Sequence, residues 1–363
     1  METNTKYRLT LVSAGIGLLL GVYAVVMILV KGHAGTTNTS SLSPWGLQII
    51  TYIYIVLIGT GCTFINFFGH IYREEEFKPV ATRVSFLAIL MVFAGLGALV
   101  TELGKPWRIL NFALSPNVTS PMWGMFFFYN VYIVFIVLEY LSLRKGRVKP
   151  WIMWGAFLSA IATYITMGSI FAISEARPYY FGALTAVYTP IVAFLTGCAL
   201  VMLAILLGKD ANPRLQASLE PVRRLMLVAL GLVLLTGLWR FIIGSWAMAE
   251  GYEVFAITAP RFLIVGVVFG ILLPAVLAFT RKTSNLFLAA VTVLVTQFVS
   301  RYDFVLDGFL VPVFRGLSDP PFVHYTPALN EVLIAVAAAS FVLFFYAIAE
   351  KKGALESTLS QEG

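Results

Sequence analysis

Polar side chains at helical spacing are the residues best placed to do chemistry in this sequence. Along residues 46–70, polar and small residues recur on one broad face of a helix: Gln48, Tyr52, Gly59, Cys62, Asn66 and His70. Tyr129, Tyr132 and Glu139 share a face in the same way, because helical residues three or seven apart lie on the same side. Such rows can relay protons. They can equally stabilise the packing of helices through interhelical hydrogen bonds, and the residues alone leave both interpretations open.

Arg240 is a permanent cation within an otherwise uncharged stretch, residues 225–247. A guanidinium at that depth needs an anion or a wet cavity, because an unpaired charge in an apolar surrounding is costly. The candidate partners are the carboxylates at similar depth: Glu102, Glu250, Asp303 and Glu331. A structural ion pair and a role in ligand binding are both compatible with the sequence.

The elements that carry these residues are long and apolar. Apolar residues make up 59% of the 363 residues and charged residues only 12%, whereas charged residues are about a quarter of a soluble domain. Runs of this length predict transmembrane helices. We therefore predict an all-α, polytopic membrane protein with one transmembrane domain, residues 1–350, and a cytoplasmic tail, residues 351–363. Ten spans are expected, at about residues 9–30, 46–70, 82–101, 121–142, 151–172, 182–207, 225–247, 262–280, 284–300 and 329–349.

Basic residues predict the orientation. Most of the 25 lysines and arginines fall in alternate loops that share a side with both termini. The positive-inside rule then places both termini in the cytoplasm, and the chain in the cytoplasmic (inner) membrane. The opposite face carries the longer segments, rich in proline, aromatic residues and paired charges, so we expect a partner or a lid outside the membrane. Ordinary capping of helix ends is the alternative.

Bound redox metals have no ligand set in the sequence. A membrane haem needs two helix-borne histidines at one depth, and the chain has only His33, His70 and His324. Iron–sulfur clusters need grouped cysteines, whereas Cys62 and Cys198 stand alone within spans and are expected to be small packing residues. We therefore expect no haem, no iron–sulfur cluster and no other metal in this chain. Motifs for ATP hydrolysis and dinucleotide binding are also missing, and nothing indicates nucleic acid.

One segment carries a family resemblance. Thr101-Glu-Leu-Gly-Lys-Pro-Trp-Arg108, followed by Ser115-Pro-Asn-Val-Thr-Ser-Pro-Met-Trp123, resembles the NrfD/PsrC (polysulfide reductase) type of membrane subunit, which carries D-L-G-R-P-x-R and then S-P-x-x-x-S-P-x-W. Glu102 and Lys105 stand where that family has Asp and Arg. Further pieces agree: Pro44-Trp-Gly46, Pro79 to Arg83, Ala176-Arg-Pro178, Arg301-Tyr-Asp303, Tyr325-Thr-Pro327 and Glu331. The ten-helix branch is most similar to the membrane subunit of the DsrMKJOP sulfite-reduction-associated complex.

The resemblance implies two four-helix bundles plus extra helices, and a haem-free subunit that reacts with quinones. In the family the menaquinone or ubiquinone pocket lies in the first bundle near the outer surface. It sits beneath an extracytoplasmic, ferredoxin-like iron–sulfur subunit that exchanges electrons with further redox subunits. Such a chain is a subunit of a quinone oxidoreductase complex and does not catalyse a reaction alone.

Both lines of reasoning lead to one site. A protein without its own metal joins electron transfer by holding an organic carrier near a partner's cluster. We expect menaquinol oxidation, or menaquinone reduction, at the outer ends of spans 2 to 5. The expected quinone-binding residues are Gln48, Tyr52, Tyr129 and Asn130 at the head group, Trp123 at its mouth and Glu102 as proton acceptor. The expected proton relay toward the cytoplasm consists of Tyr132, Glu139, Asn66 and His70.

Two other classes remain open at this point. Ten helices with intramembrane Arg and Glu also suit a secondary transporter, although transporters often pair broken helices from two related halves, and the glycines here do not form such a pair. A passive membrane anchor, in which every polar residue serves packing, is the second alternative.

Overall fold

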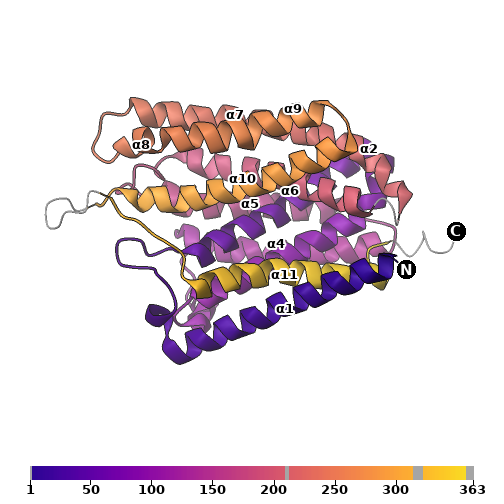
Figure 1. Cartoon of the computed structure of the whole chain (residues 1–363), viewed down its shortest axis with the longest axis horizontal. Coiled ribbons are helices and arrows are strands. Elements are labelled where there is room, and N and C mark those ends of the chain that lie inside the picture. The colour runs from indigo at the N-terminus through magenta and orange to yellow at the C-terminus, as the bar shows by residue number, and fades with distance from the viewer. Residues whose placement is uncertain (1, 209–211, 314–321, 357–363) are drawn as a thin grey trace.

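The computed structural model describes residues 2–208, 212–313 and 322–356, and this part of the chain is helical throughout its regular structure (Figure 1). Ten segments of it are long and apolar enough to cross a membrane, which confirms the predicted fold class. The elements are α1 (Glu2–Lys31), η1 (His33–Gly35), α2 (Leu47–Glu102), η2 (Pro106–Leu110), α3 (Asn111–Leu114), α4 (Pro121–Arg144), α5 (Pro150–Ala172), α6 (Ala183–Gly208), η3 (Pro213–Ser218), α7 (Leu219–Trp246), α8 (Glu253–Arg261), π-helix η4 (Phe262–Leu272), α9 (Leu273–Phe279), α10 (Thr283–Leu310) and α11 (Leu329–Lys351).

Helix α2 supplies two spans, because its two arms run antiparallel. The first arm covers Leu47–Tyr72 and the second Glu74–Glu102. Gly59 lies against Met91, and Gly69 against Phe77, so residues before the reversal pack directly on residues after it. A side chain at either glycine would collide with the opposite arm, and the lack of one lets the arms approach closely.

The ten spans form two bundles with two additional helices. The two arms of α2 pack with α4 and α5 in the first bundle, and α6, α7, α8–η4–α9 and α10 form the second. Helix α1 packs on α11, and α11 packs against α2; α1 and α11 lie at the opposite edge of the molecule from α7 and α9 (Figure 1). Lys351 lies 4.6 Å from the ring centre of Tyr7, so α1 starts where α11 stops. We call this the inner end, and the opposite one the outer end.

A glycine contact joins the two bundles. Gly61 on the first arm of α2 touches α6 so closely that an added Cβ would lie 1.8 Å from the carbonyl oxygen of Ala193. A Cβ at Gly197 would meet the backbone of Gly61 at 2.2 Å. The neighbouring Cys62 and Cys198 are free and fully buried, in agreement with the packing role predicted for them. Two backbones therefore meet here without side chains between them.

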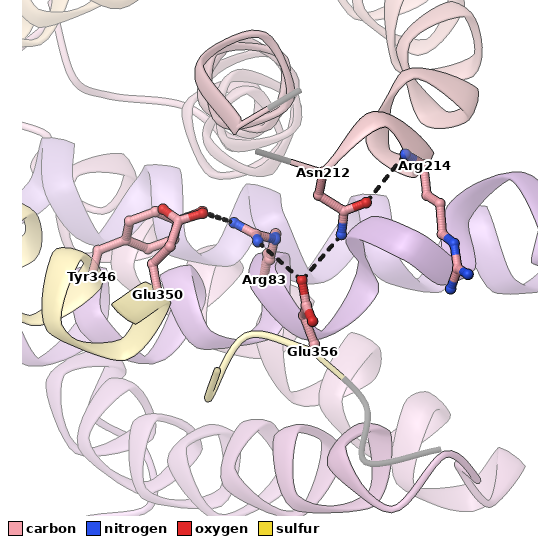
Figure 2. Close-up of polar contacts among 6 residues, drawn as sticks. All are labelled: Arg83, Asn212, Arg214, Tyr346, Glu350 and Glu356. Carbon is pink, nitrogen blue, oxygen red and sulfur yellow. Dashed lines mark hydrogen bonds and ion pairs between the residues drawn. The ribbon is translucent and has the colours of Figure 1, made fainter. Parts of the chain in front are cut away.

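Arg83 ties three segments together at the inner end (Figure 2). The buried guanidinium on the second arm of α2 contacts Glu350 at 2.5 Å and Glu356 at 3.8 Å. Glu356 also accepts a hydrogen bond of 3.2 Å from the amide of Asn212, in the connection between α6 and α7. The first residues of the predicted tail are thus packed against the bundle, with Leu355 only 1% exposed. Residues 357–363 of that tail lie outside the described residues.

The glycine contact predicts a loss of stability on substitution. Gly61→Ala or Gly197→Ala forces the two helices apart, and we expect a cost of roughly 1–3 kcal/mol or more, typical of overpacking. The measurement is the thermal unfolding midpoint of the purified protein in detergent. Gly231→Ala on α7 is the matched control, since a Cβ there meets nothing within 4 Å. An equal midpoint in Gly61→Ala and Gly231→Ala would show that the helices do not touch at this point.

Candidate functional site: a polar column in the first bundle

Two tyrosines from different helices meet in the outer half of the first bundle. The hydroxyl of Tyr52, on the first arm of α2, lies 3.1 Å from the hydroxyl of Tyr129 on α4 and 3.6 Å from the sulfur of Met125. Both tyrosines are buried. Tyr164 on α5 lies beside them, and its buried hydroxyl makes no hydrogen bond to any described residue. Three hydroxyl groups are thus gathered in an otherwise apolar interior.

A second hydroxyl pair follows one turn deeper. Tyr132 of α4 is fully buried, and its hydroxyl lies 2.7 Å from the hydroxyl of Thr63 and 3.4 Å from the carbonyl oxygen of Gly59. Sequence reasoning missed both Thr63 and Tyr164. Thr63 had a usable signal, because it stands three helical turns after Tyr52 and so shares its face. Tyr164 had none, since it stands among other polar residues of the same helix, such as Thr163 and Thr166, and nothing in the sequence distinguishes it from them.

Asn66 and Glu139 continue the row toward the inner end. The amide of Asn66 donates to the carbonyl of Ala81 at 3.1 Å and to a carboxylate oxygen of Glu139 at 3.4 Å. The other carboxylate oxygen of Glu139 is buried and has no partner in the described part of the chain. Both residues line a cavity of about 500 Å³ that also reaches His70, Lys78 and Arg147. The predicted relay residues Asn66, Glu139 and His70 therefore border one cavity at the inner end.

The outer end of the column is built around Thr101. Gln48 is fully buried and donates from its amide nitrogen to the Thr101 hydroxyl at 3.1 Å and to the Thr101 carbonyl at 3.3 Å. The ring nitrogen Nε2 of His33 lies 2.9 Å from the same carbonyl, so it acts as the donor there. The side-chain oxygen of Gln48 and one carboxylate oxygen of Glu102 are buried without a described partner. From the sequence, His33 had been considered only as a possible haem ligand.

Glu331 holds this outer end in place. The buried carboxylate accepts hydrogen bonds from the Tyr325 hydroxyl at 2.6 Å, the backbone of Ala328 at 2.7 Å and the backbone of Asn38 at 3.2 Å. Tyr325 accepts in turn from the backbone nitrogen of Leu47, the first residue of α2. Burial, together with the bond to the Glu331 carboxylate, raises the pKa of Tyr325 above its ordinary value. The start of α2 is thereby fixed at Leu47, one residue before Gln48.

An apolar groove lies beside the same outer end. It has a volume of about 370 Å³, runs between α1, the second arm of α2 and α11, and is lined almost entirely by aliphatic and aromatic side chains. Its lining includes Val22, Val25, Phe93, Gly97, Ala98, Thr101 and Phe341. Thr101 therefore belongs both to the groove and to the hydrogen-bonded group around Gln48.

Two predicted head-group residues lie on another face of α4. Trp123 donates from its indole nitrogen to the carbonyl of Phe112 at 2.8 Å and stacks on Phe127. The side chain of Asn130 is exposed and donates to the carbonyl of Phe126 on its own helix at 2.8 Å. Residues 123, 127 and 130 share one stripe of α4, and Tyr129 lies on another, so the structure does not bring Trp123 and Asn130 together with Tyr129. Trp123 instead anchors the segment η2–α3.

Arg240 also departs from expectation. Its guanidinium donates to the backbone carbonyl of Tyr179 and lies 4.4 Å from the centre of that residue's ring. The ion pairs of the described residues do not join Arg240 to Glu102, Asp303 or Glu331, three of its expected partners. The carboxylate of Asp303 instead pairs with Arg261 at 3.0 Å. Carbonyl and ring contacts replace the ion pair.

The fold and the buried column describe a multi-pass membrane protein with an internal polar pathway. Residues 35–313 match the family model described as "Polysulphide reductase, NrfD". The chain belongs to this family.

Two relatives extend the comparison. A selenate reductase subunit of Mesobacillus selenatarsenatis is 23% identical over 384 residues, which cover 91% of this chain and 90% of the relative. A putative dimethyl sulfoxide reductase membrane subunit of Halobacterium salinarum is 25% identical over 224 residues, which cover 52% of this chain and 51% of the relative. Similarity to the first extends along nearly the whole chain, and to the second along about half of it.

The inner cavity makes a prediction about accessibility. Leu143 lines the cavity, whereas Ile136, two turns deeper on α4, is fully buried. We expect Leu143→Cys to react readily with a membrane-impermeant thiol reagent and Ile136→Cys to stay unmodified, because only the first meets water. The native Cys62 and Cys198 are fully buried, so we expect no background labelling from them. Equal labelling of both variants in sealed vesicles would contradict a cavity open at the inner end.

Proposed function

We propose that this protein is the haem-free, quinone-reactive membrane subunit of a respiratory reductase-type complex. It exchanges electrons between menaquinol or menaquinone and an extracytoplasmic iron–sulfur subunit. The observation that carries the proposal is the pair of buried oxygens without a described partner, on Gln48 and Glu102, beside an apolar groove. A buried polar atom left unpaired costs about 1–3 kcal/mol. A ligand with a polar ring and an apolar tail would remove that cost.

The chemistry of the outer group fits a quinone. A quinol hydroxyl needs an acceptor, which the side-chain oxygen of Gln48 and the carboxylate of Glu102 offer. A quinone carbonyl needs a donor, which the hydroxyls of Tyr52 and Tyr129 offer from the same bundle. The apolar groove continues from Thr101 and suits an isoprenoid tail. When bound, the quinol supplies electrons together with protons, and Glu102 is the proposed proton acceptor.

We propose that electrons leave through a cofactor of a partner subunit. Among residues 2–208, 212–313 and 322–356, no group of His, Cys, Asp and Glu is arranged to hold a metal ion. The outer end presents exposed apolar side chains on and after η2–α3, including Trp107, Leu110, Leu114 and Val118. Apolar residues gathered on a loop outside the spans mark a docking surface. We assign this surface to the iron–sulfur partner, with both termini of this chain in the cytoplasm.

Protons would travel along the column in the first bundle. Tyr52, Tyr129, Tyr132 and Thr63 form hydroxyl pairs, and Thr63 and Asn66 stand on adjacent turns of one helix face. Tyr132 and Glu139 are separated by about 10 Å along α4, and Glu139 reaches the inner cavity. The arrangement supports proton movement between the quinone site and the cytoplasm, coupled to redox turnover.

The quinone site is tested by two conservative variants. Glu102→Gln removes the proton acceptor and Tyr129→Phe removes one donor, and we expect each to slow quinol turnover, Glu102→Gln by about 10²-fold or more as for a lost general base. Turnover is measured as the rate at which the purified complex oxidises added quinol. The subunit composition of the complex is checked on a gel. Asn130→Leu is the control, because Asn130 is exposed and bonded to its own helix.

The outcomes separate the alternatives. If turnover is unchanged in both variants and the purified complex retains no quinone, the chain is better explained as a passive membrane anchor. Solute uptake by the chain without redox partners would favour a secondary transporter. Loss of subunits from the complex in Tyr129→Phe alone would indicate a packing role for that residue.

The proton path is tested separately through Glu139. In vesicles that contain the complex and a pH-sensitive dye, Glu139→Gln should lower the number of protons moved per electron, because the neutral amide cannot accept a proton. Quinol turnover should persist when an uncoupler is present. Glu75→Gln, at an exposed position of the same arm of α2 that does not line the cavity, is the control. An unchanged proton-to-electron ratio in Glu139→Gln would refute the path.

A further inference from the structure

The second bundle contains a compact charge cluster that the column in the first bundle does not use. Arg240 on α7, Arg261 on α8 and Arg301 on α10 line a cavity of about 50 Å³ together with Asp303 and Asp307. No other Asp, Glu, Lys, Arg or His of the described residues lines it. Three guanidinium groups thus face two carboxylates, which leaves one positive charge in excess.

One arginine, Arg261, pairs with both carboxylates, Asp303 and Asp307. Arg261 lies 3.0 Å from Asp303 and is also hydrogen-bonded to Asp307. Arg301 is only 3% exposed and has no carboxylate within ion-pair distance in the described part of the chain. Its one side-chain hydrogen bond to a described residue is a long one, 3.4 Å to the hydroxyl of Tyr188. The excess charge therefore resides on Arg301 and Arg240.

Further polar atoms at the cavity lack partners. The Nε atom of Arg301 and the side-chain oxygen of Gln297 are buried and make no hydrogen bond to a described residue. The oxygen and nitrogen of such an amide are interchangeable by rotation, so Gln297 can present a donor to the cavity instead. A buried guanidinium with ring contacts alone is under-compensated, because burial of a charge is costly until a counter-charge is present.

Size restricts what can fill this space. A single water needs roughly 10–15 Å³ of such volume, so about 50 Å³ admits a small ion with little additional water and no organic ligand. One negative charge balances the excess. We propose that the second bundle binds one small monovalent anion of the halide class between Arg301, Arg240 and Gln297.

A second cavity, of about 200 Å³, adjoins the first toward the outer end. It is lined by Arg177 and Glu175 outside the spans and shares Tyr179 and Asp307 with the first. The opposite wall is formed by π-helix η4, through Phe262, Gly266 and Ile271. Such wide helical turns are rare and occur frequently at functional sites. The anion site is thus separate from the polar column and independent of the quinone proposal.

The anion is tested by bromide scattering and by thermal unfolding. Crystals of the full-length protein with its associated subunits, grown in bromide, should show one anomalous peak between Arg301 and Arg240. In detergent, the unfolding midpoint should rise with chloride and saturate, but stay lower in gluconate at equal ionic strength, because gluconate is too large for the cavity. Arg301→Gln should abolish the difference between chloride and gluconate.

Controls keep the test decisive. Arg224→Gln removes an exposed arginine that pairs with Glu220, and should retain the chloride effect. If Arg301→Gln does not fold, Gln297→Leu replaces it and should shift the chloride effect to higher concentration. Absence of a bromide peak together with identical midpoints in chloride and gluconate would overturn the proposal. A chloride effect of the same size in Arg301→Gln as in the unmodified protein would overturn it as well.

Discussion

Every polar group that this chain places among its apolar helices must find a partner inside the protein, because the hydrocarbon around a membrane span offers none. That constraint explains why hydroxyls occur as pairs, such as Tyr52 with Tyr129 and Tyr132 with Thr63. It also explains why Glu331, a fully buried carboxylate, receives three hydrogen bonds. Gln48, Glu102 and Arg301 each keep a buried polar atom without a partner among the described residues, and these are the places where we propose ligands.

The two bundles meet this constraint with different chemistry. The interior of the first uses mainly hydroxyl and amide groups, with the buried carboxylate of Glu139 at the inner cavity and that of Glu102 at the outer end. The second gathers arginines and aspartates around a small enclosed space. The Gly61–Gly197 contact brings the bundles backbone to backbone. The polar column and the charge cluster thus lie in different bundles of the same protein.

Much of the architecture was predictable from local patterns. Uncharged runs located the ten spans, and helical spacing placed Tyr129, Tyr132 and Glu139 on one buried face of α4. The same spacing puts Asn130 on a different face from Tyr129, and the structure has its side chain bonded to its own helix. For Arg240, its depth in the span suggested a carboxylate partner. Its observed contacts are instead a backbone carbonyl and aromatic rings.

The sequence by itself determined the class, the number of spans and the face of each helix that carries polar groups, because these depend on composition and on the 3.6-residue period within one helix. Tertiary structure alone decided which faces meet. Thr63, Tyr164 and His33 joined the column only once α2, α5 and the η1 segment were packed around α4 and Thr101. The physical reason is that hydrogen-bond partners across a bundle depend on the rotation and depth of neighbouring helices, and no single helix's residue pattern encodes these.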